Sequence, residues 1–113
     1  MIQVSDFKQE ILQWIEEMNV EAKEIHVRDM SRKWASCSNK GRLTFSSALL
    51  KESEDFRTKV IVHELLHLKY PTHGKMFKTL FTSYLRKHAI DLSLNDLPNS
   101  KMKSSKNPIE KGG

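Results

Sequence analysis

The sequence contains a single cysteine, Cys37, and no hydrophobic segment that is long enough to cross a membrane. One cysteine excludes an internal disulfide bond. Residues 1–6 also lack the positively charged and apolar regions of a secretory signal peptide. These absences fit a reducing compartment, so we expect a cytoplasmic protein that has no membrane partner.

The 113 residues are enough for one small domain with a modest core. The formal net charge is +5, and part of it lies in residues 100–113, which contain four lysines and one glutamate. This polar composition is typical of a disordered tail. We therefore expect a folded domain in residues 1–99 and a basic tail in residues 100–113. The tail could attract nucleic acid, although a lysine-bearing tail is more often simply solvated.

The most informative stretch is His63-Glu64-Leu65-Leu66-His67. Residues four apart on a helix lie one above the other, so His63 and His67 can present two imidazole nitrogens to one metal ion. Glu64 is rotated by about 100° from His63 and can instead reach a water molecule beside the ion. This is the division of labour of the H-E-x-x-H motif, which has two metal ligands and one general base.

The residues around the motif make the predicted helix apolar on nearly every side (Val60, Ile61, Val62, Leu65, Leu66 and Leu68). A helix of this kind is buried. Two buried histidines and a buried carboxylate are costly unless another group compensates them, and a metal ion would do so. The alternative is a pair of core histidines that backbone carbonyl groups satisfy.

A catalytic zinc site usually has three protein ligands and one open position. No Asp or Glu lies between the motif and Asp91, so the candidates for the third ligand are His73 and His88. Pro71 disfavours continuation of the helix and lets the chain turn back, which favours His73. We expect one zinc ion on His73 and the two motif histidines. His88 could instead be a cation in the last turn of the next helix.

Hydrophobic periodicity predicts a helix, a small sheet and two further helices, in that order. The expected helices are 6–18, capped by Ser5 or Asp6, 54–69, capped by Ser53, and 73–88, capped by Thr72. The expected strands are 24–28, 32–37 and 42–46, with the last two joined as a hairpin. The pattern indicates an α+β domain in which a small antiparallel sheet packs on the motif helix and the other helices flank it.

This arrangement predicts a free strand edge beside the metal. An extended peptide can add to such an edge through backbone hydrogen bonds. We expect the edge on residues 43–46, where Thr44 and Phe45 would contact the peptide, or on the hairpin partner of that strand.

Two stretches carry a family resemblance. Residues 63–77, which contain the motif and Pro71-Thr72-His73-Gly74, resemble the core of small bacterial YgjP-like zinc metallopeptidases. That family is related to the WLM and SprT-like (Spartan) peptidases. The upstream stretch Trp34-Ala35-Ser36-Cys37 is similar to the Trp-Gly-Ser-Cys stretch of the family, with alanine where glycine is frequent. The resemblance implies a minimal zincin fold, with zinc on the three histidines (His63, His67 and His73) and Glu64 as the base.

The resulting prediction is a zinc-dependent metallopeptidase that acts on a peptide or protein. Glu64 would take a proton from the attacking water and later deliver it to the leaving amine. The developing oxyanion also needs a donor, and the candidates are Tyr70, Tyr84 and His88. Cys37 could reach the metal as a blocking ligand, but small buried thiols without such a role are much commoner.

Three other functions remain compatible with the sequence. Zinc-activated water is not specific for peptides, so the protein could hydrolyse another bond. The SprT-like relationship and the basic charge also fit a protease of DNA-associated proteins. The third is a non-catalytic binding module that zinc only stabilises. Glu64 argues against this module, because a structural site needs no base and usually has four protein ligands.

Overall fold

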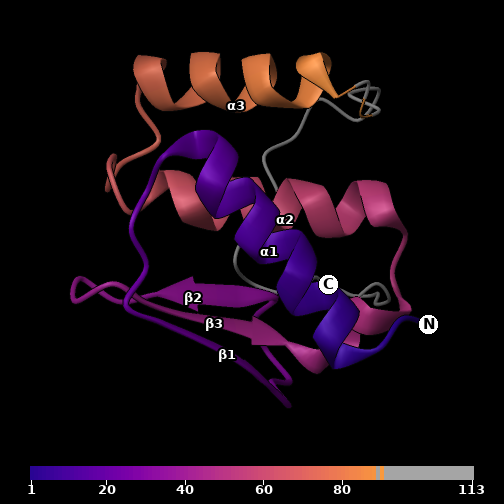
Figure 1. Ribbon diagram of the computed structural model, residues 1–113. Helices are drawn as coiled ribbons and strands as arrows, with labels where there is room; N and C mark the ends of the chain where they lie inside the picture. Colours follow the sequence, from indigo (N-terminus) through magenta and orange to yellow (C-terminus); the bar gives the residue numbers. More distant parts are fainter. Residues whose placement is uncertain (89, 91–113) are drawn as a thin grey trace, which may run out of the picture.

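The computed structural model of the chain describes residues 1–88 and residue 90. Its elements are α1 (Val4–Met18), β1 (Glu24–Arg28), β2 (Ala35–Cys37), β3 (Arg42–Ser46), a short 3-10 helix η1 (Ser47–Lys51), α2 (Glu54–Leu66) and α3 (Lys75–Lys87). Figure 1 shows the sheet on one side, α1 and α2 in the middle and α3 on the far side. The α+β fold is confirmed. The expected tail, 100–113, lies outside the described residues, so the domain boundary stays a prediction.

The three strands form a mixed sheet in the order β1-β3-β2. β2 and β3 make the predicted antiparallel hairpin, with Cys37 opposite Leu43. β1 pairs with β3 in parallel, with Val27 opposite Phe45. The prediction of a wholly antiparallel sheet is therefore wrong. Alternation along a strand shows which side chains share a face, but it does not show the direction of the neighbouring strand.

Caps fix the first turns of α1 and α2. The Ser53 hydroxyl accepts a hydrogen bond from the Phe56 N–H at 3.2 Å, so Ser53 caps α2 as predicted. α1 begins two residues earlier than predicted, because its N-cap is Gln3 instead of Ser5 or Asp6. The Gln3 N–H donates to Asp6 Oδ2 at 3.4 Å, so Asp6 supports the cap from inside the helix.

The ends of α2 and α3 that adjoin each other also differ from the prediction. α2 ends at Leu66 instead of Lys69, and the next N–H groups bond carbonyl groups three residues back, which tightens the last turn. α3 begins after Gly74 instead of Thr72. His73 therefore lies in the connection between the two helices and not in the first turn of α3.

α2 is the centre of the core and contacts α1, α3 and β2. Most of its residues from Arg57 onward are buried, as the apolar sequence predicts. Phe7 of α1 and Phe45 of β3 meet edge to face with ring centroids 5.6 Å apart. The motif thus lies on a helix that is packed on all sides. Among the described residues, no helix combines the length and the hydropathy that crossing a bilayer requires.

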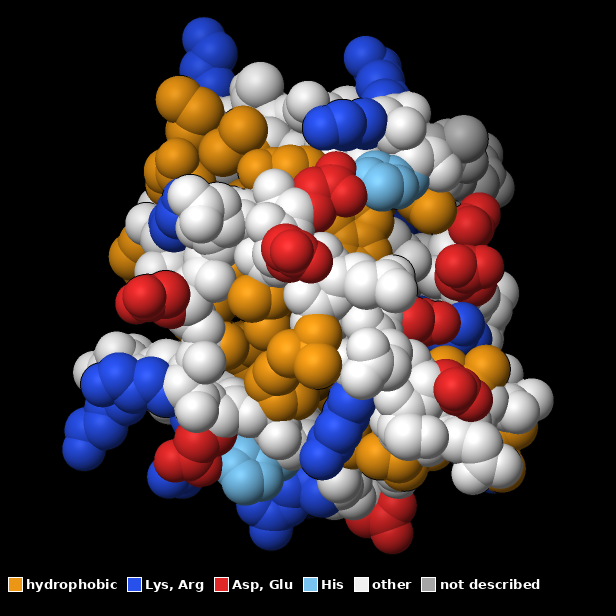
Figure 2. Space-filling model, viewed as in Figure 1, with side chains coloured by type: hydrophobic (Ala, Val, Ile, Leu, Met, Phe, Trp, Pro, Cys, Tyr) orange, Lys and Arg blue, Asp and Glu red, His pale blue; other side chains and the backbone are white. Residues whose placement is uncertain are grey.

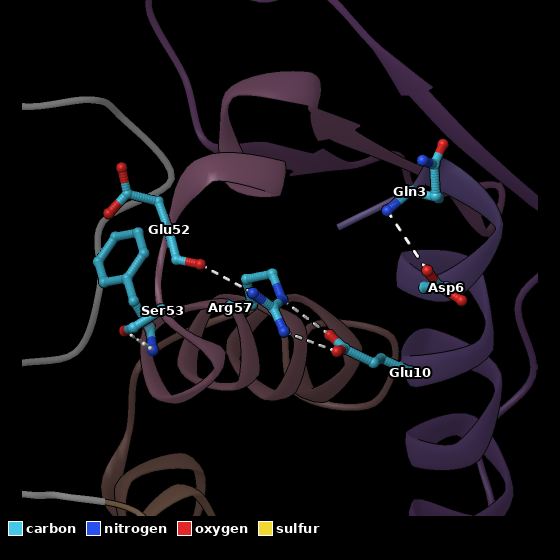
Figure 3. A network of polar contacts seen from close by, with 7 residues as sticks. Gln3, Asp6, Glu10, Glu52, Ser53 and Arg57 are labelled. Carbon is cyan, nitrogen blue, oxygen red and sulfur yellow. Dashed lines mark hydrogen bonds and ion pairs between the residues drawn. The ribbon is translucent and has the colours of Figure 1, made fainter. Parts of the chain in front are cut away.

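An ion pair between a buried arginine and a half-buried glutamate joins α1 to the start of α2 (Figure 3). Arg57 is only 6% exposed, and its Nε and Nη2 donate to the two carboxylate oxygens of Glu10 at 3.0 and 2.8 Å. Its Nη1 donates to the Glu52 carbonyl oxygen at 2.7 Å. The hydrogen bonds to Glu10 raise the pKa of Arg57. This network fixes the start of α2 against α1, and the H-E-x-x-H motif lies at the other end of the same helix.

We expect Arg57→Met to lower the free energy of unfolding by about 2 kcal/mol, because the half-buried Glu10 carboxylate then loses its partner. Chemical denaturation of both proteins measures the difference. A second change, Glu10→Gln in the same chain, should recover part of the loss, since it removes the unpaired charge. A loss below about 1 kcal/mol for Arg57→Met would show that the ion pair behaves like one on the surface.

Candidate metal centre

Three histidine side chains meet between the end of α2 and the start of α3. The Nε2 atom of His73 lies 3.0 Å from Nε2 of His63 and 3.0 Å from Nε2 of His67. In a tetrahedral zinc site with Zn–N distances of about 2.0–2.1 Å, ligand nitrogens are about 3.3 Å apart. Among residues 1–88 and 90, these three histidines are the group of His, Cys, Asp or Glu side chains that lie close enough together to hold one ion. The spacing therefore fits a metal ion held by three imidazoles.

Hydrogen bonds on the other ring nitrogen orient two of these histidines. His67 Nδ1 donates to the Tyr70 carbonyl oxygen at 3.2 Å, and His63 Nδ1 donates to Glu64 Oε2 at 3.2 Å. A carbonyl or carboxylate oxygen has no proton to donate, so both Nδ1 atoms carry the ring hydrogen. In the neutral rings, both Nε2 atoms then present a lone pair to the same point. Metal-binding histidines are usually supported in this way, so the donor set fits a divalent metal.

The site is closed on the α2 side and open at His73. His63 is buried, His67 is half-buried and His73 is exposed. Partial desolvation of the ring lowers the pKa of His73, and the neighbouring His63 and His67 lower it further. The neutral form that a metal requires is therefore favoured. The exposed side gives a water molecule or a substrate a route to the three nitrogens.

Glu64 lies at the buried side of the site and is 2% exposed. One of its carboxylate oxygens contacts the His63 ring, as described above. Burial raises the pKa of Cys37, and the charge of Glu64 raises it further, so this carboxylate lies near β2. The Cys37 thiol donates to the Ser38 carbonyl oxygen at 3.6 Å and is not part of the histidine group.

Tyr84 and His88 lie away from the three histidines. His88 Nε2 is 2.8 and 2.7 Å from the two carboxylate oxygens of Glu17, and its ring centroid is 4.5 Å from that of Trp14. The Tyr84 ring also contacts Trp14, with centroids 6.2 Å apart. Of the two candidates for the third ligand, the structure thus brings His73 to the motif and places His88 between α1 and the end of α3.

The sequence does not reveal two features of the site. The first is the Tyr70 carbonyl group that orients His67, because a backbone group leaves no signal in the residue type; the Tyr70 side chain packs against the core. The second is Phe77, which is buried against all three imidazoles. Its ring centroid lies 5.4, 4.9 and 4.8 Å from those of His63, His67 and His73.

We expect Phe77→Leu to weaken metal binding by about tenfold, because the three imidazole rings lose the flat surface that orients them. A competition titration against a coloured chelator measures the affinity. Phe7→Leu is the matched control, since Phe7 is equally buried but contacts Phe45 instead of the histidines. It should lower stability and leave the metal affinity unchanged. Equal affinities for the wild type and Phe77→Leu would contradict this role.

The strand edge beside the motif helix belongs to β2. β3 is the central strand, and its Phe45 is fully buried. The prediction that residues 43–46 accept a peptide through Thr44 and Phe45 is therefore wrong, because both edges of β3 are already paired. Among the described strands, β2 pairs with β3 alone, and β2 also contacts α2. The hairpin partner, which was the other predicted position, has the free edge.

Comparisons with known proteins agree with this geometry. The model of the YgjP-like, metallopeptidase domain family matches residues 3–91. The crystal structure of the metallopeptidase zymogen of Methanocaldococcus jannaschii jannalysin is 25% identical, with a TM-score of 0.63 over 84% of this chain and 96% of that chain. That of Pyrococcus abyssi abylysin is 21% identical, with a TM-score of 0.62 over 78% of this chain and 90% of that chain. No curated protein matches the chain.

The family match spans most of the sequence and includes the motif, His73 and the strands beside them. A metallopeptidase needs a catalytic metal, and the three converging histidines are a set of side chains that can hold it. The enzyme predicted from the motif is thus confirmed as a peptidase that uses a metal. The chain belongs to the YgjP-like metallopeptidase family.

Proposed function

We propose that the protein is a zinc-dependent peptidase whose metal is held by His63, His67 and His73. The observation that supports the proposal best is the convergence of three Nε2 atoms, with those of His63 and His67 each 3.0 Å from that of His73. Two of these nitrogens have their lone pairs fixed by Nδ1 hydrogen bonds. Imidazole ligands suit zinc, and three protein ligands leave one position for the reaction.

Zinc, when bound, lowers the pKa of water towards about 7 and polarises the scissile carbonyl group. Glu64 is the general base in this proposal: it takes the proton of the attacking water and then delivers it to the leaving nitrogen. Its burial keeps the carboxylate out of bulk water. The contact with His63 Nδ1 holds the carboxylate beside the metal ligand, and the Tyr70 carbonyl group keeps the His67 ring in place.

The substrate in this proposal is a polypeptide that binds in an extended form along β2. The free backbone groups of Ala35–Cys37 would form hydrogen bonds with it, as an added strand. Since β2 lies on α2, such a strand would run beside the motif helix. The family match favours peptide bonds over the other bonds that zinc-activated water can hydrolyse.

Incubation of the purified protein with an unfolded protein substrate tests the proposal. Mass spectrometry should detect new peptide termini, which should disappear after treatment with a zinc chelator and return when zinc is added back. A zinc-loaded protein that produces no new termini from any unfolded substrate would contradict the proposed function.

A further inference from the structure

Charge is distributed unevenly along the chain. Residues 1–64 contain ten Lys and Arg and eleven Asp and Glu, so they are close to neutral. Residues 65–90 contain five Lys and Arg and no Asp or Glu. Four of these five cations lie on α3. This helix therefore carries charge of one sign only.

Three of the four cations of α3 line a shallow groove together with three hydroxyl groups. We call it the basic groove, and its residues are Lys78, Thr79, Thr82, Ser83, Arg86 and Lys87. Their spacing of four residues places them on one face of the helix. Figure 2 shows Lys and Arg side chains that project over α3 at the top of the view.

Two cations of the basic groove form no ion pair with any residue that the structure describes. Lys87 has a counter-charge, since its Nζ lies 3.8 Å from a carboxylate oxygen of Glu17. Lys78 and Arg86 form no ion pair with another residue in the part of the chain that the structure describes, and both are exposed. A row of solvated cations with neighbouring hydroxyl groups is suited to an anionic ligand.

The N-terminal end of the basic groove lies close to the candidate metal centre, although its residues are on the face of α3 opposite Phe77. α3 starts directly after His73 and Gly74, and its Phe77 packs against the three imidazoles. The next residue, Lys78, lies within electrostatic reach of His73. His73 is also the exposed side of the site. A polypeptide bound at the exposed His73 can therefore reach Lys78 and continue along the groove.

We propose that the basic groove binds an acidic segment of the substrate, so that the enzyme selects acidic polypeptides. Lys78 and Arg86 are eight residues apart, which is about 12 Å along the helix axis. Acidic side chains about four residues apart on an extended peptide span a similar distance, so both cations can be paired at once. A polypeptide is favoured over nucleic acid, because the Lys78 end of the groove lies near a peptidase site. The inference rests on the proposed function.

Binding measurements test the groove without relying on hydrolysis. The probes are two fluorescent peptides of equal length, one rich in glutamate and one with glutamine in its place. The receptor is the full chain with Glu64→Gln, which leaves the probes uncut. We expect the acidic peptide to bind at least about fivefold more tightly, with a preference that weakens as salt is added. Adding Lys78→Gln and Arg86→Gln should remove most of this preference.

The control replaces two cations outside α3, with Lys8→Gln and Lys51→Gln, and should keep the preference. Equal affinity for the two peptides, or a preference that survives the groove changes, would overturn the inference. A single-stranded oligonucleotide that competes more strongly than the acidic peptide, and loses affinity with the groove changes, would also overturn it and assign the groove to nucleic acid. The wild-type enzyme is then assayed on both peptides. Cleavage of neither would count against the proposed function alone, because the binding result stands apart from it.

Discussion

Glu64→Gln should lower the rate of peptide hydrolysis by a factor of about 10²–10⁴ and leave the metal in place. The amide has the same shape as the carboxylate, and its oxygen can still accept the hydrogen bond from His63 Nδ1. It cannot take up the proton of the attacking water. The three ligand nitrogens belong to other residues, so the metal content should not change. Steady-state cleavage of a labelled peptide and elemental analysis of the same sample measure both effects.

Glu16→Gln is the matched control for this experiment, because Glu16 is an exposed residue of α1. It removes one negative charge from the chain, as Glu64→Gln does, and should leave hydrolysis unchanged. Full activity in Glu64→Gln would show that another group is the base. A loss of metal in that variant would show instead that Glu64 acts mainly by holding the His63 ring.

Removal of the metal should lower the melting temperature of the wild-type protein by about 15–30 °C. A ligand that binds only the folded state at about 1,000 times its dissociation constant stabilises that state by about 4 kcal/mol. In a domain of this size, each kcal/mol corresponds to about 4–8 °C. The physical reason is that the Nε2 atoms of His63 and His67 each remain 3.0 Å from that of His73 without the cation that the three would share. Thermal unfolding with and without a chelator gives the shift.

The chelator should have no effect on the melting temperature of His73→Ala, since that variant lacks one of the three nitrogens. Unchanged melting of the wild type after complete metal removal would contradict a metal that supports the fold. It would then follow that packing around α2 alone holds the motif in place.

The sequence predicts the helices of this fold better than its sheet. α2 is identified by its continuous apolar residues, and α1 by its single apolar stripe, because burial of a helix depends on its own residues. The direction of β1 was not predictable in the same way. It depends on how the connection from residues 29–34 crosses to the far side of the hairpin, and alternation carries no information about that. Because β1 pairs with β3 on the side away from β2, β3 is the central strand, and the edge that was expected to be free on residues 43–46 is occupied.

The three histidines of the candidate metal centre were predictable from the sequence, but the groups around them were not. His63 and His67 follow from helical spacing, and the structure brings their Nε2 atoms together with that of His73 as the position of Pro71 suggested. The groups that orient them were not predictable. The Tyr70 carbonyl group depends on a tightened last turn, and the contact of Phe77 with three rings depends on where α3 begins. Both are consequences of helix ends, which sequence patterns locate least well.

The metal content of the purified protein, measured beside that of His73→Ala and His88→Ala, is the most direct test of the three-histidine zinc site. The proposed site predicts one zinc ion per chain in the wild type and in His88→Ala, because His88 bonds Glu17 away from the motif. It predicts that the zinc is lost or greatly weakened in His73→Ala. Zinc that remains in His73→Ala and disappears in His88→Ala, or a wild type that binds no divalent metal, would contradict the three-histidine site.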